Sequence, residues 1–286
     1  MWRFASLYAI GKQIGRTPYF DVSVRCMLRA VQEAEDTFPE YARLLRFERR
    51  GETGRVLVDF AKHCCKFDDL GKLKGIEDDY IQLSADHLQS YHYFENMNDE
   101  IRRIFAFSQE VKKITGDYAK RLFGDDESSH KLCVYTRRGD FIQYNTHSKL
   151  NFTEKAMEYA TRVLKGKFGD VSVVLLGEDK PFLKNVTYNK KMTHAVHIPK
   201  SMSRGEDLCF AVTQCNSLLL TVPASTFGWW IGYLMNIQQA TPTKDASGYV
   251  FYNSNFFLED SFHGYRNYFP EWIPLRLLPS NAIVEM

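Results

Sequence analysis

The 286-residue chain is poor in cysteine, has no marked excess of either charge and lacks a CxxC pair. Its six cysteines are too few for a disulfide scaffold and lack the paired spacing of a zinc site, so we expect buried thiols or one or two bridges. With 37 basic and 35 acidic residues, the net charge of +2 excludes a bulk attraction to nucleic acid or to an acidic membrane surface. Any anionic ligand must therefore be held by a local group of residues.

Signals for export or membrane insertion are also sparse. Met1 is followed by Trp2 and Arg3 without the apolar stretch of a secretory leader, so we expect the sequence to start inside a folded element. The uncharged run at residues 208–243 is interrupted by polar residues and proline, which predicts strand, turn and helix in a globular core. Glycosylation sequons begin at Asn151 and Asn185 and favour a secretory lumen.

The C-terminal half alternates short apolar runs with helical stretches. Continuous apolar runs of this kind are typical of a parallel sheet covered on both faces. We predict strands at 131–136, 171–176, 195–198, 217–222 and 249–252, with helices at 153–164, 180–185, 205–215 and 226–237. The acidic, serine-containing stretch 124–130 is typical of a linker. The pattern thus indicates a Rossmann-like α/β domain over residues 128–286.

The N-terminal half is less regular. We predict helices at 2–13, 23–34 and after Asn98, with strands at 18–20, 55–60 and 80–83. This pattern indicates a looser α/β domain over residues 1–127, whose first strand is missing upstream of Met1.

Two consecutive arginines follow the predicted strand at 131–136. Arg137 and Arg138 precede Gly139 and Asp140 and would leave the carboxyl end of the strand, where doubly wound sheets bind their ligands. Guanidinium groups match phosphate oxygens in bidentate geometry, so the pair predicts a diphosphate site. The alternative is a solvated arginine pair in a surface loop.

A second strand end carries hydroxyl groups. The strand at 217–222 breaks at Pro223, and Ser225 or Thr226 can cap the next helix while hydroxyl and amide groups face an anion. The alternative is a capped core helix, with Trp229 and Trp230 in packing roles. Two such loops on one sheet together predict a nucleotide-diphosphate site.

Longer motifs resemble the galactoside α-1,2-fucosyltransferase family. They are MWRFASLYAIGKQIGRTPYF, LQSYHYFENMNDEIRRIF, VYTRRGDF, EDLCFAVTQCNSLLLTVPASTFGWWIGYL and PEWIPL, and their order and spacing match the family over nearly the whole chain. The resemblance implies a GT-B-like α/β architecture of two Rossmann-like domains facing across a cleft. Residues 1–127 would form the acceptor side, lacking its first strand, and residues 128–286 would bind GDP-fucose.

The same resemblance implies inverting, metal-independent transfer of L-fucose from GDP-fucose to the 2-hydroxyl of a terminal galactose on a glycan. It implies no cofactor and no nucleic-acid partner. Arg137 and Arg138 would neutralise the diphosphate in place of a cation. Asp140 would be either the catalytic base or a partner that orients the arginines. The resemblance also implies that Ser225 and Thr226 bind the phosphates of GDP-fucose. Asp207 or Asn216 would contact the edge of the guanine base.

Three departures from the family pattern leave other functions open. Tyr135 stands where the family motif HxRRGD has its histidine, and the glycine-rich GLGN-type segment with its strand is absent before MWRFAS. The membrane anchor expected of a Golgi enzyme with a lumenal domain is absent too. The alternatives are therefore a non-catalytic glycan or nucleotide-sugar binding protein, or an enzyme that uses another nucleotide sugar.

Overall fold

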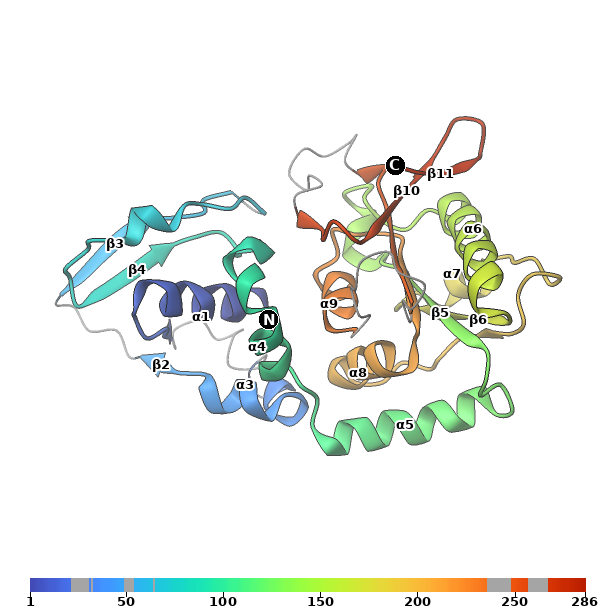
Figure 1. The fold of residues 1–286 in the computed structure, drawn as a ribbon, viewed down its shortest axis with the longest axis horizontal. Coiled ribbons are helices and arrows are strands. Elements are labelled where there is room, and N and C mark those ends of the chain that lie inside the picture. The colour runs from blue at the N-terminus through green and yellow to red at the C-terminus, as the bar shows by residue number, and fades with distance from the viewer. Residues whose placement is uncertain (22–30, 32, 49–53, 64, 236–247, 257–266) are drawn as a thin grey trace. The chain divides into compact units, whose positions relative to one another are not determined.

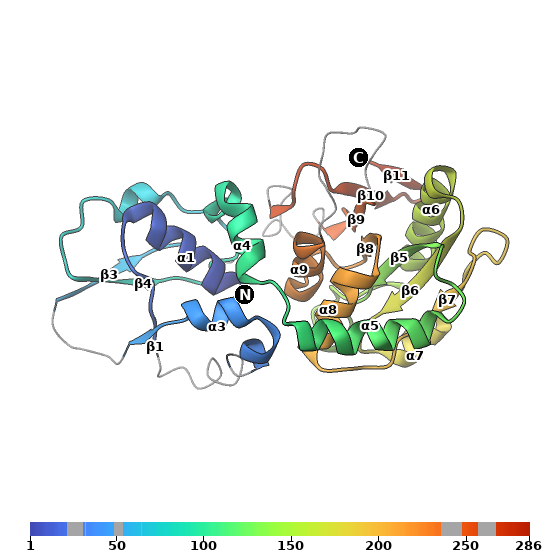
Figure 2. The ribbon, with the colours of Figure 1, turned by 60° about the horizontal axis from the view of Figure 1, so that its bottom comes forward.

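The computed structural model describes residues 1–21, 31, 33–48, 54–63, 65–235, 248–256 and 267–286 (Figure 1). These residues form two compact units: the N-terminal unit contains Met1–Ser108 together with Asn267, and the C-terminal unit contains the described residues from Gln109 onward other than Asn267. The predicted division at 127/128 was therefore too late in the chain. The reason is helix α5 (Gln109–Phe123), which packs along α8 (Arg204–Gln214) within the C-terminal unit (Figure 2).

The stretch predicted to be a linker instead contributes to a buried polar network. Asp126 accepts hydrogen bonds from Ser172 at 2.6 Å and Lys131 at 3.2 Å, and its carboxylate lies 3.0 Å from His197 Nε2. The side chains of Asp126 and Lys131 are 8% and 5% exposed. The acidic, serine-containing composition of 124–130 therefore does not mark a solvated linker. Its polar side chains form hydrogen bonds with residues at the amino ends of the strands.

The C-terminal unit contains one seven-stranded sheet. Its order is β11-β10-β9-β8-β5-β6-β7, and every neighbouring pair is parallel except β10 with β11. The six parallel strands lie in the order β7-β6-β5-β8-β9-β10. If they are numbered along the chain with β5 as strand 1, this order is 3-2-1-4-5-6, which is that of a doubly wound Rossmann sheet and confirms the predicted α/β class. The strands are β5 (His130–Tyr135), β6 (Val171–Leu176), β7 (Val196–His197), β8 (Ser217–Leu220), β9 (Val250–Asn253), β10 (Ile273–Leu277) and β11 (Ile283–Glu285).

Helices cover both faces of this sheet. α6 (Leu150–Phe168) and α7 (Lys180–Asn185) follow β5 and β6, whereas α5, α8 and α9 (Thr226–Leu234) cover the opposite face (Figure 2). The short 3-10 helix η4 (Gly139–Ile142) follows β5 after residues 136–138. Of the helix predicted at 226–237, the last two residues lie outside the described part of the chain.

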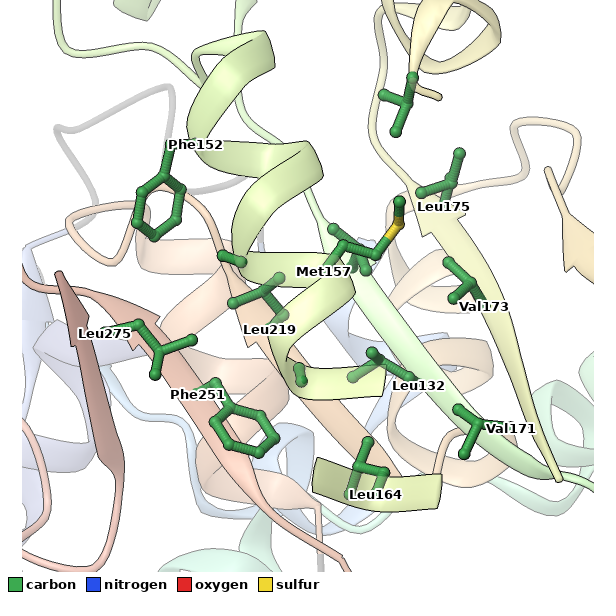
Figure 3. Packing of buried hydrophobic residues seen from close by; sticks show 14 of the residues in the cluster. Leu132, Phe152, Met157, Leu164, Val171, Val173, Leu175, Leu219, Phe251 and Leu275 are labelled. Carbon is green, nitrogen blue, oxygen red and sulfur yellow. The ribbon is translucent and has the colours of Figure 1, made fainter. Parts of the chain in front are cut away.

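Helix α6 supplies one wall of the main apolar core. Phe152, Met157 and Leu164 recur on one helix face and pack against strand residues such as Leu132 and Leu219 (Figure 3). The helix begins at Leu150, earlier than predicted, and Thr153 lies inside its first turn, where its hydroxyl donates to the Lys149 carbonyl at 2.8 Å. Continuous burial of β5, β6 and β8 explains why their sequences read as uninterrupted apolar runs.

The N-terminal unit contains two separate parallel pairs of strands. β1 (Phe20–Asp21) pairs with β2 (Phe47–Glu48), and β3 (Arg55–Asp59) pairs with β4 (Tyr80–Ser84). The predicted helix at 23–34 falls mostly outside the described residues. The helical elements are α1 (Trp2–Ile14), α3 (Pro39–Leu44), α4 (Asn98–Ile104), η1 (Leu70–Leu73), η2 (Tyr91–Tyr93) and η3 (Glu95–Met97).

A disulfide joins Cys133 of β5 to Cys215, which ends α8. It ties the sheet to the helix layer above it, as one of the bridges that the cysteine count allowed. The Cys209 thiol is buried and unbridged. No helix in the described ranges combines the length and apolarity needed to cross a membrane.

Candidate active site

The candidate site lies where the doubly wound sheet reverses its strand order. β5 and β8 are neighbours and pair in parallel, yet the chain leaves them toward opposite sides of the sheet. Ligands of such sheets bind at this topological switch point, beyond the carboxyl ends of the strands. Residues 136–138 and 221–225 form the two loops there, so the predicted arginine loop and hydroxyl loop do meet.

A chain of hydroxyl groups fixes the two loops to each other. Thr221 donates from Oγ1 to the Tyr135 carbonyl at 2.9 Å, and the Ser148 and Thr221 hydroxyls are 2.7 Å apart. Ser148 Oγ in turn accepts the Arg137 amide at 2.8 Å. Ser148 and Thr221 are fully buried, so the arginine loop starts from a rigid base.

Arg138 is held by three groups. Its Nε donates to Asp179 at 2.8 Å, its Nη1 donates to the Ser148 carbonyl at 3.0 Å, and its guanidinium lies 4.5 Å from the centre of the Phe182 ring. The Phe182 amide and then the guanidinium lower the pKa of Asp179, so this carboxylate is ionised at neutral pH. The Arg138 side chain is 22% exposed, which leaves a preorganised cation accessible at the strand end.

Arg137 is paired with two carboxylates. It donates to Asp140, and its Nη1 lies 3.7 Å from Glu178. Gly139 has φ +27°, and a Cβ there would lie 3.0 Å from the Glu178 carboxylate. Glycine is therefore needed for the turn that brings Asp140 back to Arg137. The predicted acid thus contacts the first arginine, and Asp179 contacts the second.

Tyr135, in the motif position of histidine, points toward the start of α9. Its hydroxyl lies 3.2 Å from Ser225 Oγ, and its ring stacks on Phe227. A Cβ on Gly228 would lie 2.7 Å from the tyrosine ring, so this glycine makes room for the larger side chain. Burial raises the pKa of Tyr135 to about 12, which keeps the phenol protonated and uncharged.

The two predicted phosphate ligands of the second loop differ in access. Ser225 is buried and bonded to Tyr135, whereas Thr226 is exposed at the first position of α9. Ser225 makes no side-chain capping bond to the helix. Amide groups in the first turn of a helix favour an anion, so Thr226 and the backbone supply the better-placed donors. The predicted packing roles of Trp229 and Trp230 are confirmed, since both are buried.

Asp207 lies at the carboxyl-end edge of the sheet, but Asn216 does not. Asp207 stands in the first turn of α8 and accepts the Met202 amide at 3.3 Å. Burial raises its pKa to about 6. Asn216 precedes β8, and its side chain accepts the Lys131 amide at 2.8 Å at the amino ends of the strands. The structure therefore does not bring Asn216 to the arginines, and its predicted guanine contact was wrong.

Several polar residues of the site were not predicted. Glu178, Asp179 and Lys180 follow β6, whose carboxyl end lies beside that of β5. Lys180 donates to the Pro199 carbonyl at 2.8 Å, and burial lowers its pKa. The signal was available, because the acidic pair follows the apolar run at 171–176 after a single glycine. His147 precedes Ser148, and burial followed by Lys149 and Arg138 lowers its pKa, so its imidazole is neutral at pH 7.

The arrangement can bind an anion without further groups. Two guanidiniums follow β5, and the N-terminus of α9 with the exposed Thr226 hydroxyl follows the neighbouring strand β8, a set of groups that suits a diphosphate. Across the described part of the chain, no cluster of three or more His, Cys, Asp or Glu side chains could hold a metal ion.

Comparisons with known proteins relate these residues to a family. The family model described as Glycosyl transferase family 11 matches residues 56–276, which include both loops. The Caenorhabditis elegans protein svh-11 is 26% identical over 298 residues, covering 99% of this chain and 77% of that protein. A Caenorhabditis elegans galactoside 2-alpha-L-fucosyltransferase is 26% identical over 238 residues, covering 74% of this chain and 57% of that enzyme. Among solved structures, POFUT1 in complex with GDP gives a TM-score of 0.40 at 11% identity, covering 81% of this chain and 90% of that one.

Proposed function

The chain belongs to glycosyl transferase family 11, and from this premise we propose that it transfers L-fucose from GDP-fucose to the 2-hydroxyl of a terminal galactose. One observation carries the proposal: two adjacent arginines stand at the switch point of a doubly wound sheet, where the neighbouring strand β8 leads into α9. The relatives named as galactoside 2-alpha-L-fucosyltransferases support the choice of sugar and acceptor.

In this proposal the C-terminal unit binds the donor. The diphosphate contacts Arg138 directly and the first turn of α9 through Thr226 and backbone amides. Asp207 accepts N–H groups of the guanine from the first turn of α8. The N-terminal unit supplies the acceptor side.

The reaction is a single inverting displacement. The acceptor 2-hydroxyl attacks the anomeric carbon of fucose while the bond from that carbon to the diphosphate oxygen breaks, and GDP leaves with the electron pair. Negative charge grows on the diphosphate, where Arg137 and Arg138 are fixed before the reaction begins. Their permanent charge performs the task that a divalent cation performs in other transferases. The acceptor proton passes to a base.

Donor binding must rearrange the ion pairs of the free site. Arg137 pairs with Asp140 and Glu178, so a phosphate oxygen replaces at least one carboxylate oxygen around this guanidinium. Arg138 keeps Asp179 at Nε and the Ser148 carbonyl at Nη1, so we assign the contact with the donor to its Nη2 group. We assign Asp140 the role of orienting Arg137. The alternative is that Asp140 is the general base, and substitution of Asp140 distinguishes the two roles.

The compartment belongs to the same proposal. We place the enzyme in the Golgi lumen, since the Cys133–Cys215 disulfide suits an oxidising compartment and both sequon asparagines are exposed. Asn185 ends α7 and Asn151 lies in the first turn of α6. Expression in secretory cells followed by glycosidase digestion tests this, with Asn185→Gln and Asn151→Gln as single-site controls. A chain that carries no glycan at either asparagine contradicts the lumenal assignment.

Calorimetry with GDP and GDP-fucose tests the donor site. We expect Arg138→Ala to abolish binding or weaken it at least tenfold, and Arg121→Ala, an exposed arginine on α5, to leave binding unchanged. Transfer to a galactose-terminated oligosaccharide should fall about 10²–10³-fold in Arg138→Ala. Unchanged transfer by that variant excludes the central assignment. If the chain binds GDP but transfers no sugar, it is better described as a non-catalytic binding protein. If it prefers another nucleotide sugar to GDP-fucose, it is an enzyme with a different donor.

A further inference from the structure

Residues 137–148 form a closed loop at the carboxyl end of β5. The Ser148 amide donates to the Arg137 carbonyl at 2.8 Å, and Ser148 Oγ accepts the Arg137 amide at the same distance. Arg138 Nη1 adds a hydrogen bond to the Ser148 carbonyl at 3.0 Å. The two ends of the loop are therefore joined directly beside the arginine pair. Surface loops whose ends are joined in this way are Ω-loops, and they frequently carry functional side chains.

The tip of this loop is a hydrogen-bonded turn. The Asn145 amide donates to the Ile142 carbonyl at 3.0 Å, and the Thr146 amide donates to the Phe141 carbonyl at 3.2 Å. Asn145 has φ +56°, a left-handed conformation that asparagine adopts more readily than most residues. The centre of the Phe141 ring in turn lies 5.1 Å from Cζ of Arg137. The turn therefore closes on a residue that contacts the arginine pair, so its tip stays within one short turn of those cations.

Tyr144 is the side chain that this turn leaves most open to solvent. It is 70% exposed, which is the largest exposure among the bulky hydrophobic side chains in the part of the chain that the structure describes. Ile142, two positions earlier, is 46% exposed. Single exposed aromatic side chains are common, but this ring is held by a fixed backbone next to the candidate diphosphate site. An aromatic ring in this position can cover the apolar face of a ligand bound at the arginines.

The amide of Asn145 supplies a polar group beside Tyr144. Lys149 Nζ donates to Asn145 Oδ1, which orients the amide. Within the described ranges, Asn145 Nδ2 donates to no other protein group, and the residue is exposed. A sugar offers both an apolar face of C–H groups and hydroxyl oxygens that accept hydrogen bonds. An aromatic ring with an adjacent amide donor therefore suits a sugar.

We propose that Tyr144 stacks on the terminal galactose of the acceptor while Asn145 Nδ2 donates to one of its hydroxyl oxygens, an inference that rests on the transfer proposed above. The attacking 2-hydroxyl must reach the anomeric carbon of fucose, which is bonded to the diphosphate at Arg138. The galactose ring therefore lies beside the arginine loop. In galactose the axial 4-hydroxyl leaves the C–H groups of C3, C4 and C5 on one face, whereas in glucose the C–H group of C4 points to the other face. Stacking on Tyr144 thus selects galactose over glucose.

The fluorescence of Tyr144→Trp tests this contact without requiring transfer. Lactose ends in galactose, and cellobiose is the same disaccharide with glucose at that end. Each sugar is titrated into GDP-saturated protein. We expect lactose to shift the emission of this variant to shorter wavelength and cellobiose to leave it unchanged. The natural chain, whose tryptophans are all buried, is the control and should show no shift with either sugar.

Steady-state kinetics with lactose as the acceptor give a second measurement. Tyr144→Ala should raise KM for lactose about tenfold and leave kcat and the KM for GDP-fucose unchanged. Tyr144→Phe keeps the ring and should retain the KM of the natural chain. Asn145→Gly keeps the left-handed turn but removes the amide, and should raise KM for lactose about fivefold. The matched control is Tyr188→Ala, at an exposed tyrosine after α7, which should behave as the natural chain does.

The proposal is overturned if lactose shifts the emission of Tyr144→Trp no more than cellobiose does. It is also overturned if Tyr144→Ala raises the KM for GDP-fucose but not for lactose, because the ring would then contact the fucose. If Tyr144→Ala and Tyr188→Ala transfer fucose to lactose with the same KM, the proposed transfer stands and the contact with Tyr144 is refuted. A lactose-specific shift in a protein that transfers no sugar would support the galactose contact and contradict only the proposed transfer. An unchanged KM in Asn145→Gly would remove Asn145 from the contact.

Discussion

The hydroxyl of Tyr135 lies 3.2 Å from the hydroxyl of Ser225, and both residues are buried. The contact joins the end of β5 to the start of α9 across the switch point of the sheet. A tyrosine therefore fits the motif position of histidine because Gly228 admits its ring and Ser225 satisfies its hydroxyl. Its role is to hold the loop, since a protonated phenol adds no positive charge beside the arginines.

This geometry predicts that Tyr135→Phe keeps transfer activity. Phenylalanine preserves stacking on Phe227 and loses only one hydrogen bond, so the free energy of unfolding should fall by about 0.5–1.5 kcal/mol. Ser225→Ala should lower the free energy of unfolding by a similar amount. The double variant should lower it by less than the sum of the two single effects, because both substitutions remove the same hydrogen bond. Denaturant unfolding measures all three. A drop in kcat of a hundredfold or more in Tyr135→Phe would show instead that the phenol takes part in transfer.

Asp140 is expected to act through Arg137. Asp140→Asn keeps the size of the side chain and a hydrogen-bond acceptor, so transfer should fall by about tenfold while the pH dependence of kcat/KM keeps its shape. Glu178→Gln, which alters the other carboxylate near Arg137, is the matched control and should give a similar loss. If Asp140→Asn alone removes the acidic limb of the profile and lowers kcat about 10³-fold, Asp140 is the base.

Asp207 predicts a pH dependence of donor binding. Its folded pKa of about 6 is raised by burial, so the carboxylate that would accept guanine N–H groups is lost as the pH falls below 6. We expect the Kd for GDP to rise between pH 7.5 and 5 in the natural chain. Asp207→Asn should bind GDP about tenfold more weakly at pH 7.5, and its Kd should change less between pH 7.5 and 5, where only the terminal phosphate of GDP still titrates. Identical profiles for both proteins would remove Asp207 from the donor site.

The same pKa has a consequence for the ligand-free protein. A folded pKa above the unfolded value of about 4 gives stability that is present below pH 4 and lost as the pH rises through 6. Asp207→Asn should therefore have the higher Tm at pH 8 and lose this advantage at pH 4. Thermal unfolding at the two pH values measures the difference.

The central strands of the C-terminal sheet were predictable because burial on both faces leaves an uninterrupted apolar run, as at 171–176. The placement of the arginine loop beside the loop that leads into α9 followed from topology alone, since both loops stand at carboxyl ends of paired strands in one sheet. The contacts of individual side chains did not follow. Asn216 looked suitable by residue type, but its position before β8 places it at the other end of the strands.

Short elements were harder to predict for a physical reason. β1, β2 and β7 have two residues each, so no periodicity could reveal them fully. The partners Glu178 and Asp179 are fixed by the pairing of β6 with β5, which is a long-range contact. The unit boundary was missed for the same reason, because the packing of α5 on α8 joins distant parts of the sequence.

Asp126 lies in the stretch whose composition predicts a linker, but its buried hydrogen-bond network predicts a large effect of its substitution on stability. Its carboxylate is buried, which alone would raise its pKa, but hydrogen bonds from Ser129, Ser172, His197 and Lys131 hold the pKa far below the usual range. Asp126→Asn should therefore lower the free energy of unfolding by about 3–5 kcal/mol at pH 7, because Lys131 is left buried without its counter-charge.

The sign of the pH dependence follows from the lowered pKa of Asp126. The stabilisation is complete above the unfolded pKa of about 4 and is lost as the pH falls further toward the folded value. The difference between the natural chain and Asp126→Asn should thus be constant from pH 5 to 8 and shrink below pH 4. Asp125→Asn, at the exposed neighbouring position, should be neutral throughout. Denaturant unfolding between pH 3 and 8 measures the free energy of unfolding of both variants. Equal effects of the two substitutions would contradict the buried network and show that residues 124–130 behave as a solvated linker.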